Sequence, residues 1–274
     1  SLIILDDASR DTGATRAAAF ASTLPNRDIT VARRAEWLGA TQTFLRLISA
    51  APPGAIAFAD QDDVWLPTKL SRAMEALSRI PERVPALYCS RTIVCDAALF
   101  RKRLSSVFRS PPWCGIALVL YFAAGITIVL NPMAARIMRA GAATRADVVA
   151  HDWYCYQLIT GAGGQVIFDQ EPGLYYRQHA QNHVGANHGP LARAQRLAAV
   201  AQGQLTAWAD ANVRALNAVL PLLTPNNRRT LAAFEAARTL PPWRRLEALR
   251  RLGVYRQTRA ADAVLRLAAL TGKL

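Results

Sequence analysis

Short runs of β-prone apolar residues alternate with amphipathic segments from residue 2 to residue 168. The apolar runs stand at 2–5, 55–58, 86–89 and 166–168. They are continuous rather than alternating, which is typical of strands covered on both faces. The segments between them carry apolar residues at helical spacing. This alternation predicts an α/β domain with a mostly parallel sheet flanked by helices.

The spacing predicts helices over 132–139 and 152–160, and another between Pro67 and Pro81. In the last of these, the apolar residues that recur at helical spacing are Leu70, Met74, Leu77 and Ile80.

The strand pattern disappears after residue 190, where Ala, Leu and Arg dominate between prolines. We therefore expect an α/β domain over 1–189 and an Arg-rich helical extension over 190–274. The extension holds 13 Arg and 1 Lys against four acidic residues, a net charge of +10 out of +14 for the whole chain. Such a surface attracts phosphates, nucleic acid or anionic lipid headgroups, and charge alone does not choose among them.

Composition excludes several classes of protein. With 52% hydrophobic and 19% charged residues, the chain is neither disordered nor of low complexity. The four cysteines show no Cys-x-x-Cys spacing, which predicts buried free thiols in a reducing compartment. The apolar run 116–130 is too short and too interrupted to span a bilayer. We expect a cytoplasmic protein.

Acidic residues follow two of the predicted strands. Asp6 and Asp7 come after the first, and Asp60-Gln61-Asp62-Asp63 comes after the run 55–58. Ligands bind beyond the carboxyl ends of strands in parallel α/β sheets. Neighbouring carboxylates repel one another, and a hard divalent cation, Mg²⁺ or Mn²⁺, would neutralise them. The alternative is a turn that caps the following helix.

The string from Phe58 to Leu70, FADQDDVWLPTKL, resembles the signature of family 2 glycosyltransferases, particularly the bacterial rhamnosyltransferase-like branch. Three further segments resemble the same family in the same order: 4–11, 151–153, and 176–179 with Asn182 and Gly185. The resemblance implies a GT-A type fold and an inverting transfer of a sugar from a nucleotide-diphosphate donor. It further implies a saccharide or lipid-linked saccharide acceptor in cell-surface polysaccharide synthesis, with rhamnose as the sugar this branch suggests.

The resemblance also implies roles for single residues. Asp6 or Asp7 would accept hydrogen bonds from the base or ribose, and Arg177 would contact phosphate. Asp152 would be the general base that takes the proton of the acceptor hydroxyl. The metal ligands would be Asp60, Asp62 and His179, with Asp63 as a nearby helper. The competing interpretation of Asp152 is a carboxylate that caps the helix it opens, and that of His179 is a solvated loop residue.

The sequence departs from the family at its beginning, because members carry a further strand and helix ahead of Leu2. This departure predicts an N-terminally truncated catalytic domain with weak or no activity. We expect that restoring the upstream segment would restore turnover.

Two other functions remain open. One is a metal-dependent nucleotidyltransferase, although the chain lacks both Gly-rich phosphate-loop patterns. The other is a non-catalytic basic module for an anionic membrane or nucleic acid, which leaves the acidic residues 60–63 unexplained. For the extension, a peripheral contact with the inner face of the plasma membrane competes with an ordinary helical bundle that has a solvated Arg face. Nucleic acid is not the expected partner.

Overall fold

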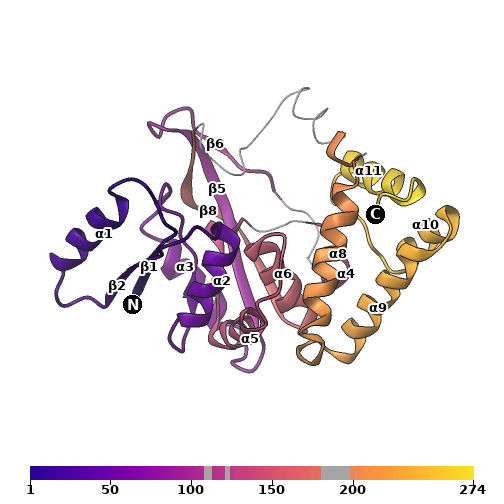
Figure 1. Ribbon diagram of the computed structural model, residues 1–274, viewed down its shortest axis with the longest axis horizontal. Helices are drawn as coiled ribbons and strands as arrows, with labels where there is room; N and C mark the ends of the chain where they lie inside the picture. Colours follow the sequence, from indigo (N-terminus) through magenta and orange to yellow (C-terminus); the bar gives the residue numbers. More distant parts are fainter. Residues whose placement is uncertain (108–112, 121–123, 180–197, 201) are drawn as a thin grey trace.

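A computed structural model describes residues 1–107, 113–120, 124–179, 198–200 and 202–274. The chain begins with strand β1 (Leu2–Asp6), helix α1 (Gly13–Ser22), strand β2 (Ile29–Arg33) and helix α2 (Ala40–Ala50). β1 and β2 pair in parallel, with Leu2 opposite Ile29, and form a sheet of their own. This small α/β unit lies at one end of the molecule (Figure 1).

The main sheet lies in the middle of the molecule and is mixed. Its strands follow the order β3-β7-β5-β8-β4, with β6 paired to β5. Their bounds are β3 (Ile56–Ala57), β4 (Val64–Trp65), β5 (Ala86–Asp96), β6 (Arg103–Leu104), β7 (Val129–Leu130) and β8 (Gln165–Gln178).

The α/β class is confirmed, and the two longest pairings are parallel as expected, while the short strands make the main sheet mixed. Among the described strands only β1–β2 and β5–β8 pair in parallel, while the pairings that involve β3, β4, β6 and β7 are antiparallel. Apolar runs locate strands but do not give their direction. β4 and β6 are two-residue strands, so they carry hardly any periodic pattern of their own.

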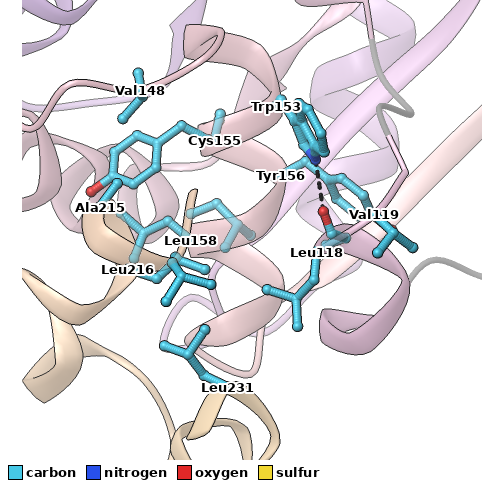
Figure 2. Close-up of a cluster of buried hydrophobic side chains, with 14 of the residues drawn as sticks. Leu118, Val119, Val148, Trp153, Cys155, Tyr156, Leu158, Ala215, Leu216 and Leu231 are labelled. Atoms are coloured by element: carbon cyan, nitrogen blue, oxygen red, sulfur yellow. Dashed lines mark hydrogen bonds between the residues drawn. The ribbon is translucent and has the colours of Figure 1, made fainter. Parts of the chain in front are cut away.

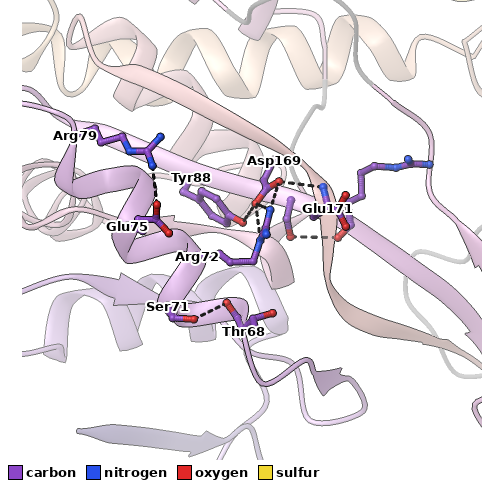
Figure 3. Close-up of polar contacts among 10 residues, drawn as sticks. Thr68, Ser71, Arg72, Glu75, Arg79, Tyr88, Asp169 and Glu171 are labelled. Atoms are coloured by element: carbon purple, nitrogen blue, oxygen red, sulfur yellow. Dashed lines mark hydrogen bonds and ion pairs between the residues drawn. The ribbon is translucent and has the colours of Figure 1, made fainter.

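A polar network fixes helix α3 (Lys69–Ser78) to the long β5–β8 pair (Figure 3). Arg72 makes a bidentate ion pair with Asp169, whose carboxylate also accepts the Tyr88 hydroxyl at 2.7 Å. Asp169 lies where the β5–β8 register shifts, just before Pro172, which suits an irregular point because it donates no ladder bond. The network thereby ties α3 to the sheet.

Helix α6 (His151–Gly161) is the central helix of the molecule. Every residue from Asp152 to Gly161 is buried, as expected for a helix covered on all sides. It contacts α4 (Cys114–Ala117), α5 (Pro132–Ala143) and α8 (Gln204–Asn217). The helices predicted over 132–139 and 152–160 are therefore confirmed.

The C-terminal segment is helical, as its composition predicts. After α8 come the 3-10 turn η2 (Leu220–Leu222), α9 (Pro225–Thr239), α10 (Pro242–Arg251) and α11 (Arg259–Leu270). Thr224 and Thr258 cap α9 and α11 through their side-chain hydroxyls. The expected boundary at 189/190 lies outside the described residues.

One cluster of buried side chains runs from the main sheet to the C-terminal helices. Tyr156 and Leu158 of α6 belong to it together with Leu216 of α8 and Leu231 of α9 (Figure 2). All four cysteines are free and buried, which confirms the expectation of buried thiols. Among the described residues, no helix is both long and apolar enough to cross a membrane.

Candidate active site

Three carboxylates meet in the loop between β3 and β4. Asp60, Asp62 and Asp63 each offer an oxygen, and these oxygens all lie within 4.8 Å of one another. We call these three residues the acidic cluster. Clustered carboxylate oxygens are the ligands that Mg²⁺, Ca²⁺ and Mn²⁺ prefer, so the donor set fits a hard divalent cation.

Asp63 is the most perturbed member of the acidic cluster. Its Oδ1 accepts the Arg177 N–H at 3.1 Å, whereas its Oδ2 is buried with no hydrogen-bond partner among the described residues. Burial raises the pKa of Asp63 to about 7, and the charges of Asp62 and Asp60 add to the effect. An ionised Asp63 therefore needs a further positive partner.

The end of β8 comes back to the acidic cluster. The antiparallel pairing of β4 with β8, with Val64 opposite Tyr175, carries residues 177–179 next to the loop. The His179 Nε2 lies 2.7 Å from the Asp62 Oδ2. The structure thus brings Asp60, Asp62, Asp63, Arg177 and His179 together, although more than a hundred residues separate the two segments. Asn182 and Gly185 lie outside the described residues.

Lys69 is a component of this site to which the sequence analysis gives no role. It opens α3, is 1% exposed, and donates from Nζ to the Ile126 carbonyl at 2.7 Å. Its Nζ also lies 3.4 Å from the centroid of the Trp65 ring, a cation–π contact. Burial lowers the pKa of Lys69 to about 7, against the opposing charges of Asp63 and Asp60.

Asp6 and Asp7 hold the small N-terminal unit together. Asp6 accepts the Ser9 N–H and pairs with Arg33 at 3.2 Å. Asp7 accepts the backbone N–H groups of Leu38 and Gly39, at the start of α2. Asp6 is the last residue of β1 and Asp7 follows it, and both carboxylates make contacts within the protein.

Asp152 lies in the first turn of α6 and is 4% exposed. Its Oδ1 accepts the Trp153 N–H and its Oδ2 accepts the Gly125 N–H, both at 2.8 Å. Gly125 opens the 3-10 turn η1 (Gly125–Thr127), which precedes β7. The contacts of the helix-capping interpretation are therefore present in the structure.

His151 packs beside Asp152 in an aromatic pocket. Its ring stacks on Phe44 at 4.1 Å between centroids and meets Phe58 edge-on. A Cβ on Gly125 would lie 2.7 Å from the His151 Nε2, so only glycine permits this approach. Burial lowers the pKa of His151, which favours the neutral ring.

Residues 1–125 match the family described as Glycosyl transferase family 2. A curated relative is the dTDP-rhamnosyl transferase RfbG of Shigella flexneri, which is 28% identical over 214 residues, 73% of this chain and 70% of the relative.

A solved structure that resembles the chain is the mannosyltransferase PcManGT from Pyrobaculum calidifontis in complex with GDP-Man and Mn²⁺. It has a TM-score of 0.47 and 15% sequence identity, with coverage of 97% of this chain and 77% of that one. Residues 1–125 therefore match a family 2 glycosyltransferase domain, and the chain is similar to a rhamnosyltransferase.

Proposed function

We propose that the chain transfers a sugar, with rhamnose as the first to test, from a nucleotide diphosphate to a saccharide or lipid-linked saccharide acceptor. The reaction inverts the anomeric centre, uses a GT-A type catalytic domain over 1–189, and serves cell-surface polysaccharide synthesis. The observation that carries the proposal is the acidic cluster with His179 against Asp62 and Arg177 against Asp63. This arrangement combines ligands for a cation with donors for a diphosphate.

Mg²⁺ or Mn²⁺ would be held by Asp60, Asp62 and His179, with Asp63 as the fourth candidate ligand. When bound, such an ion supplies positive charge that stabilises the departing diphosphate. The backbone N–H of Arg177 meets Asp63, and its guanidinium would contact phosphate, because a guanidinium forms paired hydrogen bonds to phosphate oxygens. Asp6 or Asp7 would accept hydrogen bonds from the base or ribose.

Asp152 would act as the general base. As the acceptor oxygen forms its bond to the anomeric carbon, the bond from that carbon to the diphosphate oxygen breaks, and the hydroxyl proton moves to an Asp152 oxygen. Its hydrogen bond from Gly125 would orient the carboxylate for this transfer.

Calorimetric titration of UDP and dTDP, with and without Mn²⁺, tests the donor site. We expect Mn²⁺-dependent binding that is lost in Asp62→Ala and kept in Asp28→Ala, which removes an exposed carboxylate elsewhere. Equal binding by Asp62→Ala would contradict the proposed site. The anomeric configuration of the product, read by NMR, tests inversion.

We also propose that the C-terminal helices place this cytoplasmic enzyme on an anionic membrane surface. Five exposed residues of α10 share one face at helical spacing: Trp243, Arg244, Glu247, Arg250 and Arg251. An exposed Trp among Arg side chains is typical of helices that lie at a lipid headgroup boundary.

Flotation with vesicles tests this surface. We expect the chain to float with phosphatidylglycerol vesicles at low salt, and not with phosphatidylcholine vesicles. Trp243→Ala should reduce flotation, whereas Trp37→Ala, at a comparably exposed Trp on the opposite end of the sequence, should not. Equal flotation of the two variants would contradict the assignment to α10.

A further inference from the structure

Lys69 is buried between the acidic cluster and the η1 turn. The chain has only three lysines, and this one is 1% exposed. Lysine is almost never fully buried unless its charge is paired. A buried lysine next to three carboxylates therefore calls for an explanation beyond ordinary packing.

Lys69 contacts residues on both sides of the loop that carries the acidic cluster. Its Nζ lies 3.5 Å from the carbonyl oxygen of Phe58, just before the loop, and over the ring of Trp65, just after it. The stem passes Gly173, where a Cβ would lie 3.4 Å from the Lys69 Cγ. Lys69 thus contacts both ends of the segment that presents Asp60, Asp62 and Asp63.

The shorter hydrogen bond of the Lys69 Nζ connects it to another part of the chain. Its 2.7 Å hydrogen bond ends on the Ile126 carbonyl in η1. The preceding residue of the same turn, Gly125, donates its N–H to Asp152 at 2.8 Å. One three-residue turn is therefore held by Lys69 on one side and by Asp152 on the other.

We propose that Lys69 is a positioning residue that fixes the acidic cluster relative to η1, and through η1 relative to Asp152. This inference rests on the proposed function, because it gives the metal-binding loop and the general base a fixed distance. The position of Lys69 beside the acidic cluster gives this residue a second effect. When protonated, its ammonium places positive charge beside Asp63 and Asp60, so it lowers the negative charge that a divalent cation meets.

The two effects are measured separately on Lys69→Met, a substitution that keeps most of the side-chain length. The turn should become less ordered, whereas Mn²⁺ affinity should not fall. Loss of the contact to Ile126 should speed amide hydrogen exchange at 125–128 by about tenfold or more. Loss of the positive charge should leave Mn²⁺ affinity unchanged or raise it, by up to about tenfold, when Mn²⁺ alone is titrated and free Mn²⁺ is followed by electron paramagnetic resonance. Lys102→Met, at an exposed lysine, should change neither.

Turnover supplies the third measurement. Lys69→Met should lower kcat by about tenfold or more while KM for the sugar nucleotide stays within about threefold, because alignment rather than donor binding is lost. Lys69→Gln, which keeps an N–H donor but no charge, serves in place of Lys69→Met if the latter does not fold.

Three results would overturn the proposal: unchanged exchange at 125–128 in a folded variant, weaker Mn²⁺ binding by the variant, or a loss carried by KM alone. Weaker Mn²⁺ binding would show that Lys69 merely holds the loop together. If the unmodified chain binds neither nucleotide nor Mn²⁺, the proposed function fails, and the exchange experiment alone then decides whether Lys69 fixes η1.

Discussion

At the scale of single residues, the Asp152 carboxylate can perform two roles at once: it can stabilise the start of α6 and accept a proton. Its two oxygens accept backbone N–H groups from the first turn of α6 and from η1. Such bonds orient a carboxylate and leave lone pairs available, because each oxygen accepts more than one hydrogen bond. The same side chain can therefore hold the helix and take a proton.

Asp152→Asn tests the second role. The amide oxygen can still accept one of the two N–H groups, whereas the NH2 group cannot accept the other, and the side chain no longer takes a proton at neutral pH. We expect kcat to fall by about 10²–10⁴, with dTDP or UDP affinity within about twofold. Steady-state kinetics and calorimetry check this, with Asp147→Asn, an exposed neighbour, as control. Full activity of Asp152→Asn would assign the carboxylate to the helix alone.

His151 makes stability depend on pH. Its folded pKa lies below the unfolded value of 6.5, so the unfolded chain binds the proton first as pH falls. His151 should therefore contribute a loss of stability as pH drops below 6.5, with a slope of at most about 1.4 kcal/mol per pH unit. Asp63 acts in the opposite direction over the same range, because its folded pKa of about 7 lies above its unfolded value. Urea unfolding at pH 5 to 8 of the unmodified chain and of His151→Gln separates the two, since the difference between their slopes is the His151 contribution. Identical slopes would exclude His151 as a source.

At the scale of elements, α3 shows what helical spacing can and cannot predict. The flanking prolines predict where α3 starts and ends. Leu70 and Met74 belong to the apolar set that recurs at helical spacing, but they do not face the core, because they are 44% and 46% exposed. The buried face carries Lys69, Ala73 and Leu77 instead. Both sets have helical spacing, and a lysine does not count as apolar in a pattern. Lys69 lies four residues before Ala73 and eight before Leu77, and this spacing places it on the buried face of α3.

The acidic cluster was predictable because its three residues lie within four positions of one another. The partners of the loop were predictable only through the family resemblance, since the distance of His179 from Asp62 depends on the β4–β8 pairing. Pairing partners and strand direction arise from long-range contacts, which periodicity does not contain. The capping contacts of Asp7 and Asp152 follow from local chemistry, because both lie where helix N-terminal N–H groups need acceptors.

The attachment of α3 to the sheet gives an element-scale prediction. Tyr88→Phe removes the hydroxyl that donates to Asp169 in a buried place. We expect a loss of about 1 kcal/mol in the free energy of unfolding, the usual contribution of one hydrogen bond. Tyr175→Phe, on the neighbouring strand near the surface, should change stability less. Denaturant unfolding of the two variants checks this, and an equal loss would contradict a special role for the network.

At the scale of the whole molecule, the buried cluster joins the C-terminal helices to α6. Phe234 of α9 is fully buried in the same cluster as Tyr156 of α6. A continuous core favours a single cooperative transition. The helices after residue 203 thus contribute stability to the part that carries Asp152, whatever further role they have at a membrane.

Phe234→Ala tests this coupling. We expect a loss of about 3–5 kcal/mol, typical of removing a buried aromatic ring. Circular dichroism follows the helices, and labelling of the Cys155 thiol follows the opening of α6. Both transitions should move to lower denaturant by the same amount, and Leu270→Ala, at an exposed position, should move neither. Separate shifts would show that the two parts unfold independently.

The buried state of every cysteine also has a practical consequence. Cys89, Cys95, Cys114 and Cys155 are all shielded, and burial raises the pKa of Cys155 well above its ordinary value. Thiol reagents react with the thiolate, so the folded chain should stay unmodified under mild conditions. A cysteine introduced at Asp28 or Lys273, both exposed, would then be a unique attachment point for a fluorophore or spin label, with no native thiol to remove first.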